Sequence, residues 1–264
     1  MILIDSHCHL DKINYKKIKK NIYQILKEAK KKNIKYILNV STSINNFDKM
    51  KILLKNKKNI FYACGIHPFY YKKNIIIEEI KKRLKEKKVI AVGEIGLDYS
   101  KQNKINKERQ KKMFLDQIKI SKEFKKPIIV HTRNSIKDTI KILEISEISN
   151  YGGIIHSFNQ TNLKNLKKII DLNFYISISG IITFKNASEL RNIIKYIPLN
   201  KLLIETDSPY LSPEPYRGKE NRPSNLYYIA KCVAKLKKIK LDEISEIMKE
   251  NFKKLFNLKK KSIT

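Results

Sequence analysis

The sequence predicts a (β/α)₈ barrel, on three observations: eight short apolar runs, amphipathic segments between them, and a length of 264 residues. Barrels of this kind commonly occupy roughly 250 residues as a single domain. Hydrophobic residues make up 42% of the chain, which is enough for a sizeable core, and no low-complexity linker interrupts it. We therefore expect one domain over residues 1–264.

The eight candidate strands are short runs rich in β-branched and aromatic residues. They are nearly continuous in apolar character, as expected of parallel strands that are buried on both faces. In chain order they are 1–7 (MILIDSH), 34–40 (IKYILNV), 60–66 (IFYACGI), 89–95 (VIAVGEI), 127–132 (PIIVHT), 152–157 (GGIIHS), 173–179 (NFYISIS) and 201–206 (KLLIET).

Between these runs, apolar residues recur with the period of an α-helix amid charged residues. We expect helices at 16–32, 44–56, 75–87, 105–125, 161–171 and 185–196, and two closing helices near 223–238 and 241–257. The Pro-rich stretch 209–223 is predicted to be a long loop after the eighth strand. A doubly wound open sheet is the alternative architecture, but no glycines have dinucleotide-binding or P-loop spacing to favour it.

Charge and cysteine content narrow the function classes. The formal net charge is +32, and only six of the 57 basic residues are arginine. This charge fits a polyanionic substrate, yet a joint excess of Lys, Ile and Asn also fits an A/T-rich genome. The three cysteines are too scattered for a disulfide framework or a zinc finger, so we expect reduced thiols.

Nothing at the amino terminus resembles a signal peptide, and no apolar run approaches the length of a membrane span. We expect a cytoplasmic protein without membrane contact, and a monomer.

All five histidines fall at or just after the end of a predicted strand, and Glu94 and Asp207 do the same. The carboxyl ends of barrel strands meet at one face, where active sites are built. Alternate strand residues point the same way, so His7 and His9 can face one metal ion while Cys8 points away. The predicted metal ligands are His7, His9, Glu94, His131, His156 and Asp207.

Imidazole and carboxylate ligands without thiolate are typical of catalytic Zn²⁺, Mn²⁺ or Mg²⁺. Six protein ligands are too many for one ion that keeps a water molecule, so two ions that share a carboxylate fit better, with Glu94 as the candidate bridge. Such a pair would acidify a water molecule and stabilise an anionic transition state. Asp207 is a candidate both for a ligand and for the group that takes the proton of the attacking water.

At this point the chain resembles the TatD family of metal-dependent deoxyribonucleases. The resemblance runs from about residue 3 to residue 257, in order throughout. It rests on segments 5–11 (DSHCHLD), 65–68 (GIHP), 93–99 (GEIGLDY), 130–133 (VHTR), 155–158 (IHSF), 179–185 (SGIITFK), 205–211 (ETDSPYL) and 216–219 (YRGK). The His-x-His element alone is common to the amidohydrolase superfamily, whereas the Glu94 and Asp207 segments together are specific.

The resemblance implies a TIM barrel with two divalent ions. One would be bound by His7, His9, Glu94 and Asp207, and the other by Glu94, His131 and His156. It also implies phosphodiester hydrolysis in nucleic acid, in some members as a 3′→5′ exonuclease or at abasic sites. All six ligand positions are intact; the departures, such as Asn159 where relatives often carry Ser, are small.

Further residues are candidates for substrate binding. His67, Arg133, Arg217 and Lys219 are expected to contact substrate phosphates, because a guanidinium or ammonium group matches a phosphate. Tyr99, Tyr210 and Phe158 are weaker candidates for stacking on a base. Asp98 is interpreted either as a partner of a ligand histidine or as a helix cap.

The favoured function is therefore a nuclease-type hydrolase with two Mg²⁺, Mn²⁺ or Zn²⁺ ions, acting on nucleic acid and most plausibly on single-stranded DNA. The first alternative is an amidohydrolase or deaminase of a small amide, lactone or nucleobase. Such enzymes commonly carry a carbamylated lysine on the fourth strand, where this chain has Glu94. The second alternative is a non-catalytic barrel that binds nucleic acid through its charge, which the intact ligand set disfavours.

Overall fold

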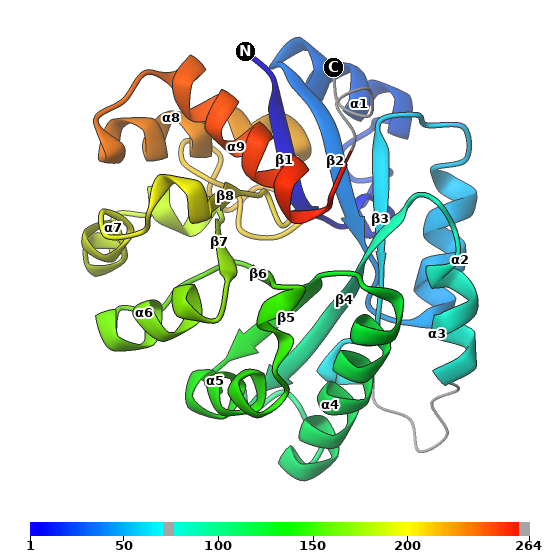
Figure 1. The fold of residues 1–264 in the computed structure, drawn as a ribbon. Coiled ribbons are helices and arrows are strands. Elements are labelled where there is room, and N and C mark those ends of the chain that lie inside the picture. Colours follow the sequence, from blue (N-terminus) through cyan, green and yellow to red (C-terminus); the bar gives the residue numbers. More distant parts are fainter. Residues whose placement is uncertain (71–76, 259–264) are drawn as a thin grey trace.

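A computed structural model describes residues 1–70 and 77–258 of the chain. Eight parallel strands follow one another around a nearly closed barrel in the order β1 to β8, with helices outside (Figure 1). The strands are β1 (Leu3–Cys8), β2 (Ile34–Val40), β3 (Ile60–Cys64), β4 (Val89–Asp98), β5 (Ile128–Arg133), β6 (Gly153–Ile155), β7 (Phe174–Ile178) and β8 (Leu202–Ile204). The barrel predicted from the sequence is confirmed, and the open-sheet alternative is wrong.

Closure of the barrel between β8 and β1 occurs beyond the last residues of β8. The backbone N–H of Asp207 donates to the carbonyl of His7 over 2.9 Å, and that of His9 donates to the carbonyl of Ser208 over 2.8 Å. Deeper in the barrel, the Ser6 hydroxyl donates to the carbonyl of Ile204. The same bonds that close the barrel therefore fix three candidate site residues against one another.

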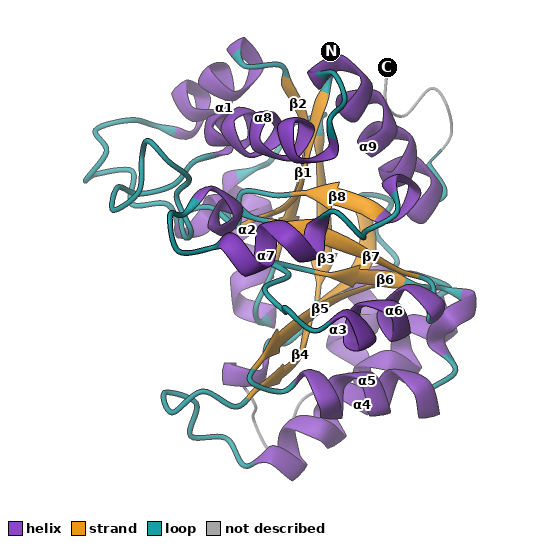
Figure 2. Ribbon diagram, turned by 90° about the vertical axis from the view of Figure 1, so that its left-hand side faces the viewer, coloured by secondary structure: helices purple, strands orange, loops and turns teal. Residues whose placement is uncertain are grey.

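The helices surround the strands in both views (Figures 1 and 2). They are α1 (Ile22–Lys31), α2 (Ile44–Leu53), α3 (Ile77–Leu84), α4 (Lys107–Phe124), α5 (Ile136–Ile145), α6 (Leu163–Asp171), α7 (Ser188–Ile194), α8 (Leu226–Lys237) and α9 (Leu241–Leu255). The helix α5 completes the alternation in a segment for which no bounds were predicted. None of the described helices is long and apolar enough to cross a membrane.

The predicted helix limits differ from those in the structure by up to six residues, most of all at the start of the first helix. The helix expected over 16–32 begins only at Ile22, because Asn21 and Gln24 form a capping box in which each side chain accepts a hydrogen bond from the other's backbone N–H. Residues 16–20 instead form turns. Residues 75 and 76 of the helix expected over 75–87 lie outside the described part of the chain, and α3 ends at Leu84.

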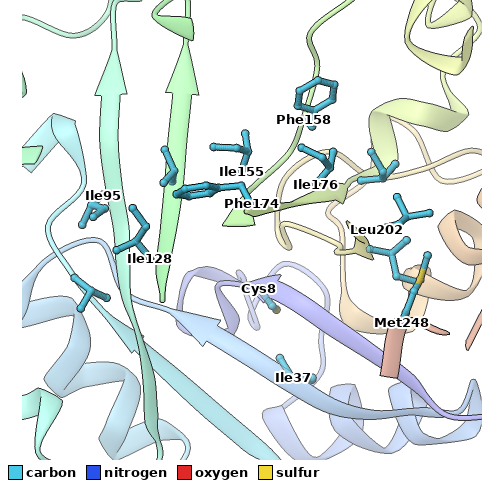
Figure 3. Close-up of a cluster of buried hydrophobic side chains, with 14 of the residues drawn as sticks. Cys8, Ile37, Ile95, Ile128, Ile155, Phe158, Phe174, Ile176, Leu202 and Met248 are labelled. Atoms are coloured by element: carbon cyan, nitrogen blue, oxygen red, sulfur yellow. The ribbon is translucent and has the colours of Figure 1, made fainter. Parts of the chain in front are cut away.

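Apolar side chains form two clusters, one on each side of the strands. The inner cluster takes residues from every strand and from α9: Ile4, Tyr36, Leu38, Val40, Ala63, Ile90, Ala91, Ile129, Ile154, Tyr175, Leu203, Phe252 and Phe256. Only the barrel interior is accessible to all eight strands, so these side chains fill it. The outer cluster, part of which is seen in Figure 3, packs the other strand faces against the helices.

The three cysteines are free, as expected, with Cys8 and Cys64 buried and Cys232 partly buried.

Candidate functional site

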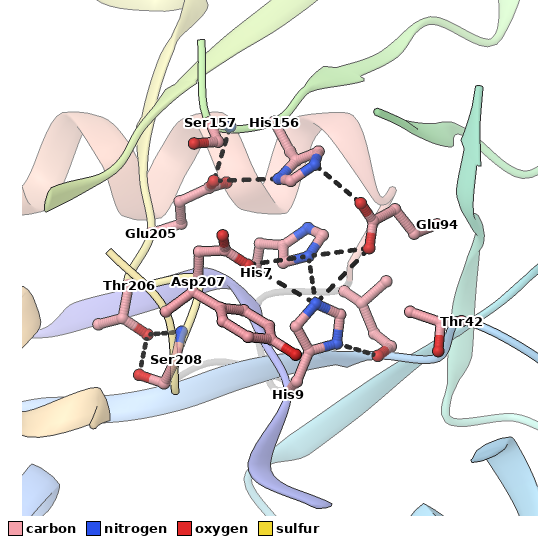
Figure 4. A network of polar contacts seen from close by, with 12 residues as sticks. His7, His9, Thr42, Glu94, His156, Ser157, Glu205, Thr206, Asp207 and Ser208 are labelled. Carbon is pink, nitrogen blue, oxygen red and sulfur yellow. Dashed lines mark hydrogen bonds and ion pairs between the residues drawn. The ribbon is translucent and has the colours of Figure 1, made fainter. Parts of the chain in front are cut away.

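The candidate ligands converge at the carboxyl ends of five strands. His7 lies in β1 and His9 directly after it, Glu94 in β4 and His131 in β5. His156 follows β6 and Asp207 follows β8. Their side chains form one buried network of polar contacts, most of which is drawn in Figure 4. The two oxygens of Glu94 divide this network into two groups of donor atoms.

The first donor group consists of His7 Nε2, His9 Nε2, Glu94 Oε2 and Asp207 Oδ1. The two imidazole nitrogens are 3.1 Å apart. Glu94 Oε2 lies 3.6 Å from His7 Nε2 and 3.5 Å from His9 Nε2. Asp207 Oδ1 lies 3.7 and 3.6 Å from the same two nitrogens. Four potential ligand atoms therefore face a common centre.

The second donor group consists of Glu94 Oε1, His131 Nδ1 and His156 Nε2. The carboxylate oxygen lies 2.9 Å from each of the two nitrogens. The nitrogens are 3.2 Å from each other. One carboxylate thus has one oxygen in each group, the arrangement required of a bridging ligand.

Local backbone geometry explains how β1 presents its histidines. The pairing register of β1 with β2 is irregular between Asp5 and Cys8. Leu3 and Cys8 both belong to the outer apolar cluster although they are five positions apart, an odd offset that places residues of a regular strand on opposite faces, so the strand changes phase between them. His7 and His9 therefore flank an outward Cys8 and face the interior together, as the alternation of strand residues predicted.

Two further backbone features bring the remaining groups together. Gly96 has φ +133°, and a Cβ there would lie 2.1 Å from the carbonyl oxygen of His131, so only glycine lets β4 approach β5 this closely. Asp207 has φ +53°, a left-handed conformation that aspartate tolerates better than most residues. Backbone strain of this kind is concentrated at functional sites.

Hydrogen bonds at the outer ring nitrogens determine which way the histidines present their lone pairs. His9 Nδ1 donates to the carbonyl of Val40 over 2.7 Å, and His131 Nε2 donates to Asp98 Oδ2 over 2.9 Å. His156 Nδ1 lies 3.3 Å from Glu205 Oε1. Because the outer nitrogen carries the proton in each neutral ring, the inner nitrogen presents a lone pair to its donor group.

His67 has the opposite polarity. Its Nδ1 accepts a hydrogen bond from the backbone N–H of Phe69 over 3.1 Å, so the neutral ring carries its proton on Nε2. This Nε2 lies 3.5 Å from Glu94 Oε1 at the edge of the second donor group. His67 is therefore arranged to donate a hydrogen bond into the site, whereas His9, His131 and His156 present lone pairs to it.

Burial and charge set the protonation of the two donor groups differently. Burial lowers the pKa of His7 and of His9, and the nearby His156 and Lys12 respectively add to this. For His131 and His156 burial also acts to lower the pKa, but the carboxylates of Asp98, Glu205 and Glu94 outweigh it, and both pKa values are raised. The first pair of histidines is thus neutral at pH 7, and the second pair tends to hold protons.

The acidic members of the cluster also differ. Burial alone would raise the pKa of Glu94, but His156, His67 and His131 outweigh it and hold that pKa well below its usual range. Burial dominates at Asp207 and raises its pKa to about 8, although His156 acts in the opposite direction. A cation in the first donor group would favour the ionised form of Asp207.

The donor atoms fit divalent ions. Ligands about 2.0–2.1 Å from a tetrahedral metal ion are roughly 3.4 Å apart, and the contacts within the two groups span 2.9–3.7 Å. Ligand atoms of His7, His9 and Glu94 lie within 4.8 Å of one another, so they could hold an ion. The same spacing is found for His7, His156 and Glu205, and for His67, Glu94 and His131, where the proton on His67 Nε2 disfavours His67 as a ligand. Donors are nitrogen and carboxylate oxygen only, since Cys8 packs in the outer apolar cluster.

The site opens into a cavity of about 360 Å³. Its walls carry Arg133, Tyr210 and His67 of the predicted substrate-binding residues, together with Lys12, Thr42, Phe69 and Tyr70. Arg133 and Tyr210 are exposed at the rim.

Other candidates lie outside this cavity. Arg217 and Lys219 are exposed in the loop after β8, and the Arg217 guanidinium lies over the ring of Phe184, 4.3 Å from its centroid. The interpretation of Phe158 as a stacking residue is wrong, because its ring is buried in the outer apolar cluster. Tyr99 bonds to Asp138 and is only partly exposed.

Asp98, for which two roles were considered, contacts His131. It is not a helix cap, since Asn106 caps α4.

Sequence reasoning assigned no role to three residues that the structure places at the site. Glu205 is fully buried, accepts from the backbone N–H of Ser157 and contacts His156. Asp5 is also fully buried and accepts from Thr206, and its burial raises its pKa to about 7. Lys12 lines the cavity. A signal existed for the first two, because an acidic residue inside an apolar strand is costly without partners.

Known metal-dependent hydrolases are similar to this chain over almost its whole length. The sequence profile of the family described as TatD related DNase matches residues 4–257. A metal-dependent hydrolase of Buchnera aphidicola from Acyrthosiphon pisum is 48% identical over 98% of this chain and 100% of its own length. The metal-dependent hydrolase YcfH of Escherichia coli is 39% identical over 98% of this chain and 97% of its own.

Among solved structures, the TatD homolog YjjV of Escherichia coli superimposes with a TM-score of 0.89 at 29% identity, covering 97% of this chain and 98% of that one. A TatD family hydrolase of Entamoeba histolytica has the same fold, with a TM-score of 0.84, at 24% identity and 97% and 98% coverage. With the family profile spanning nearly all of the sequence, the chain belongs to the TatD-related DNase family of metal-dependent hydrolases.

Proposed function

We propose that the protein is a divalent-metal-dependent phosphodiesterase that cleaves nucleic acid, as a deoxyribonuclease acting from the 3′ end. One observation carries the proposal: a single carboxylate, Glu94, has one oxygen in each of two donor groups at the carboxyl end of the barrel. His7, His9, Glu94 and Asp207 would hold one ion, and Glu94, His131 and His156 the other. Bound divalent ions supply an acidified water molecule and neutralise the charge that develops on a phosphate.

The residues of the chain then have distinct tasks. Asp207, whose carboxylate adjoins His7 and His9, accepts the proton of the attacking water at a carboxylate oxygen. Burial of the donor groups limits access of bulk water and strengthens their electrostatic interactions. His67 Nε2–H and the Arg133 guanidinium donate to the non-bridging oxygens of the phosphate, because both face the cavity. Arg217 and Lys219 contact the nucleic-acid strand outside the cavity.

The proposal extends to the protein's setting. We infer a single-domain monomer in the cytoplasm, with Mg²⁺, Mn²⁺ or Zn²⁺ as the ions and single-stranded DNA as the substrate. The charge of the chain supports a nucleic-acid substrate, since a net charge of +32 attracts a polyanion over long distances.

The test is hydrolysis of 3′-labelled single-stranded DNA by metal-stripped protein, titrated with Mg²⁺, Mn²⁺ and Zn²⁺. We expect nucleotides to be released from the 3′ end only with metal present, and chelation by EDTA to stop the reaction. Glu94→Ala should remove the activity. Protein that binds two ions but leaves DNA and RNA intact would contradict the proposed substrate and direct attention to small amides and esters.

A further inference from the structure

One cation at the catalytic cavity has no task in the proposed reaction. Lys12 lies in the turn Leu10–Lys12, directly after β1, and its partly buried side chain lines the cavity. Its charge acts on the rings of both His9 and His67, where after burial it is one of the causes that lower the two pKa values. Lys12 is therefore part of the wall of the cavity that contains the donor groups.

Within residues 1–70 and 77–258, no hydrogen bond or ion pair joins the side chain of Lys12 to another residue. The side chain of Arg133, on the other side of the cavity, likewise has no hydrogen bond or ion pair with another residue in this part of the chain. By contrast, Arg83 pairs with Asp48 and Glu79, and Arg222 with Glu28. A cation without a protein partner at the wall of a cavity can form a charge-assisted hydrogen bond with an anionic group that enters the cavity.

The topology places the two free cations opposite each other. Lys12 follows β1 and Arg133 ends β5, so four of the eight strand steps separate them around the barrel. An eight-stranded barrel is roughly 15 Å across its backbone. A nucleotide chain that crosses the cavity from Arg133 toward Lys12 would bring one phosphate onto the donor groups and the next one toward Lys12.

Aromatic rings border the same path. Tyr70 and Tyr210 are each 49% exposed and line the cavity. Tyr210 packs against His9 with ring centroids 6.1 Å apart, and Tyr70 against His67 at 6.3 Å. Rings at a cavity rim offer faces on which a base can stack. The cavity thus combines a second anion position with surfaces for bases, the chemistry of a nucleotide chain.

We propose that Lys12 binds the phosphate next to the one that is cleaved, so that the site selects a polynucleotide over a molecule with a single phosphodiester. This inference rests on the proposed function. It concerns the neighbouring phosphate of the substrate, which the ion-binding residues do not contact. Lys12 is a specificity-determining residue, because its contact lies one phosphate away from the reacting bond.

The experiment compares a deoxytrinucleotide, which has a phosphate beside the cleaved one, with a dinucleoside monophosphate, which has none. We measure kcat/KM for both with metal-loaded wild type, Lys12→Ala, Lys12→Arg and the control Lys17→Ala, which removes an exposed lysine outside the cavity. In Lys12→Ala the ratio of the two kcat/KM values should fall about tenfold, as expected for loss of a charge-assisted hydrogen bond. Lys12→Arg should restore the ratio, and Lys17→Ala should leave it unchanged.

Salt dependence gives a second readout. The slope of log affinity for an oligonucleotide against log salt should decrease by about one in Lys12→Ala, because one phosphate contact is lost. A ratio that stays the same in Lys12→Ala, or that falls equally in Lys17→Ala, would overturn the role of Lys12 while leaving the nuclease intact. Wild-type protein that cleaves neither substrate would overturn the proposed function instead.

Discussion

The two donor groups share Glu94 but are supported in different ways. In the first group His7 and His9 are 0% and 2% exposed, and the outer nitrogen of His9 bonds to a backbone carbonyl. In the second group His131 and His156 are backed by carboxylates, Asp98 and Glu205, and the His131 side chain is 17% exposed toward the cavity. The first group has four donors, whereas the second has three and includes His131, the most exposed of the candidate ligands.

This difference implies that the two donor groups have different tasks. The first group, with four donors and a neutral backbone acceptor behind His9, is suited to holding an ion firmly. The second group has carboxylate-backed and therefore more basic histidines, and its three donors leave a position for a substrate oxygen. The cavity that carries Lys12 and Arg133 is lined by members of both groups, His9 and Asp207 from the first and His131 and His156 from the second.

Glu94→Ala removes the only side chain common to both groups, so both should lose their ion together. We expect hydrolysis to fall about a thousandfold, equivalent to about 4 kcal/mol of transition-state stabilisation. Bound metal, measured by elemental analysis after gel filtration, should fall from two ions per chain toward none. Glu78→Ala, which removes an exposed carboxylate, is the control and should keep both. Retention of two ions in Glu94→Ala would mean that the carboxylate does not bridge.

His7→Ala and His156→Ala should separate the groups. Each removes one donor from one group, so each variant should keep a single ion, with activity reduced about a hundredfold. His67→Ala is the matched control, because its Nε2 is a donor and not a lone pair. It should keep two ions and lose only substrate affinity. Loss of an ion in His67→Ala would make His67 a ligand and contradict the comparison.

Acidification should empty the second group first. Its histidines have raised pKa values, so an ion must displace up to two protons there, and its affinity falls as pH drops below those pKa values. In the first group only Asp207, with its pKa raised to about 8, holds a proton at pH 7, since His7 and His9 have lowered pKa values. The affinity of the second group for its ion should therefore fall about tenfold more per pH unit than the affinity of the first group.

Calorimetric titration of His7→Ala and His156→Ala with Zn²⁺ from about pH 8 to about pH 6 measures each group alone. The number of protons released on binding is obtained by repeating the titration in buffers with different heats of ionisation. Equal pH slopes for the two variants would remove the electrostatic difference between the groups. In metal-free protein, protonated His156 stabilises the fold at low pH, and this stabilisation is lost as pH rises through its raised pKa.

Asp98→Asn should leave every donor atom in place and weaken only the second group. A neutral amide still accepts from His131 Nε2–H but no longer raises its basicity, so ion affinity in the second group should fall about 10- to 100-fold. The first group should be unaffected in the same titration. Asp116→Asn, on the outer face of α4, is the control. An equal loss in both groups would show that they do not act independently.

Glu205 connects the groups. Its Oε2 and His7 Nδ1 are both buried without a hydrogen-bond partner among the described residues, while its Oε1 contacts His156. One potential ligand atom from each of His7, His156 and Glu205 lies within 4.8 Å of the others. A buried polar atom without a partner is costly, so the Glu205 carboxylate, which contacts His156 and lies close to His7, provides a negative charge beside one histidine of each group.

The sequence by itself determined the barrel and the candidates for its site. Eight apolar runs alternating with amphipathic segments leave few other folds, because parallel strands need crossover helices on their outer faces. Histidines and acids at strand ends could be proposed as ligands, since strand ends share one face. The family resemblance, carried by motifs such as 205–211, is confirmed.

Tertiary structure alone decided which partners each side chain has. The hydrogen bond from Phe69 N–H sets His67 apart from the other histidines, and the burial of Phe158 removes it from the substrate path. The roles of Glu205 and Lys12 depend on atoms brought together from distant parts of the chain. Sequence patterns record which way a side chain points along its own strand, whereas a pKa or a lone-pair direction depends on neighbours that only closure of the barrel supplies.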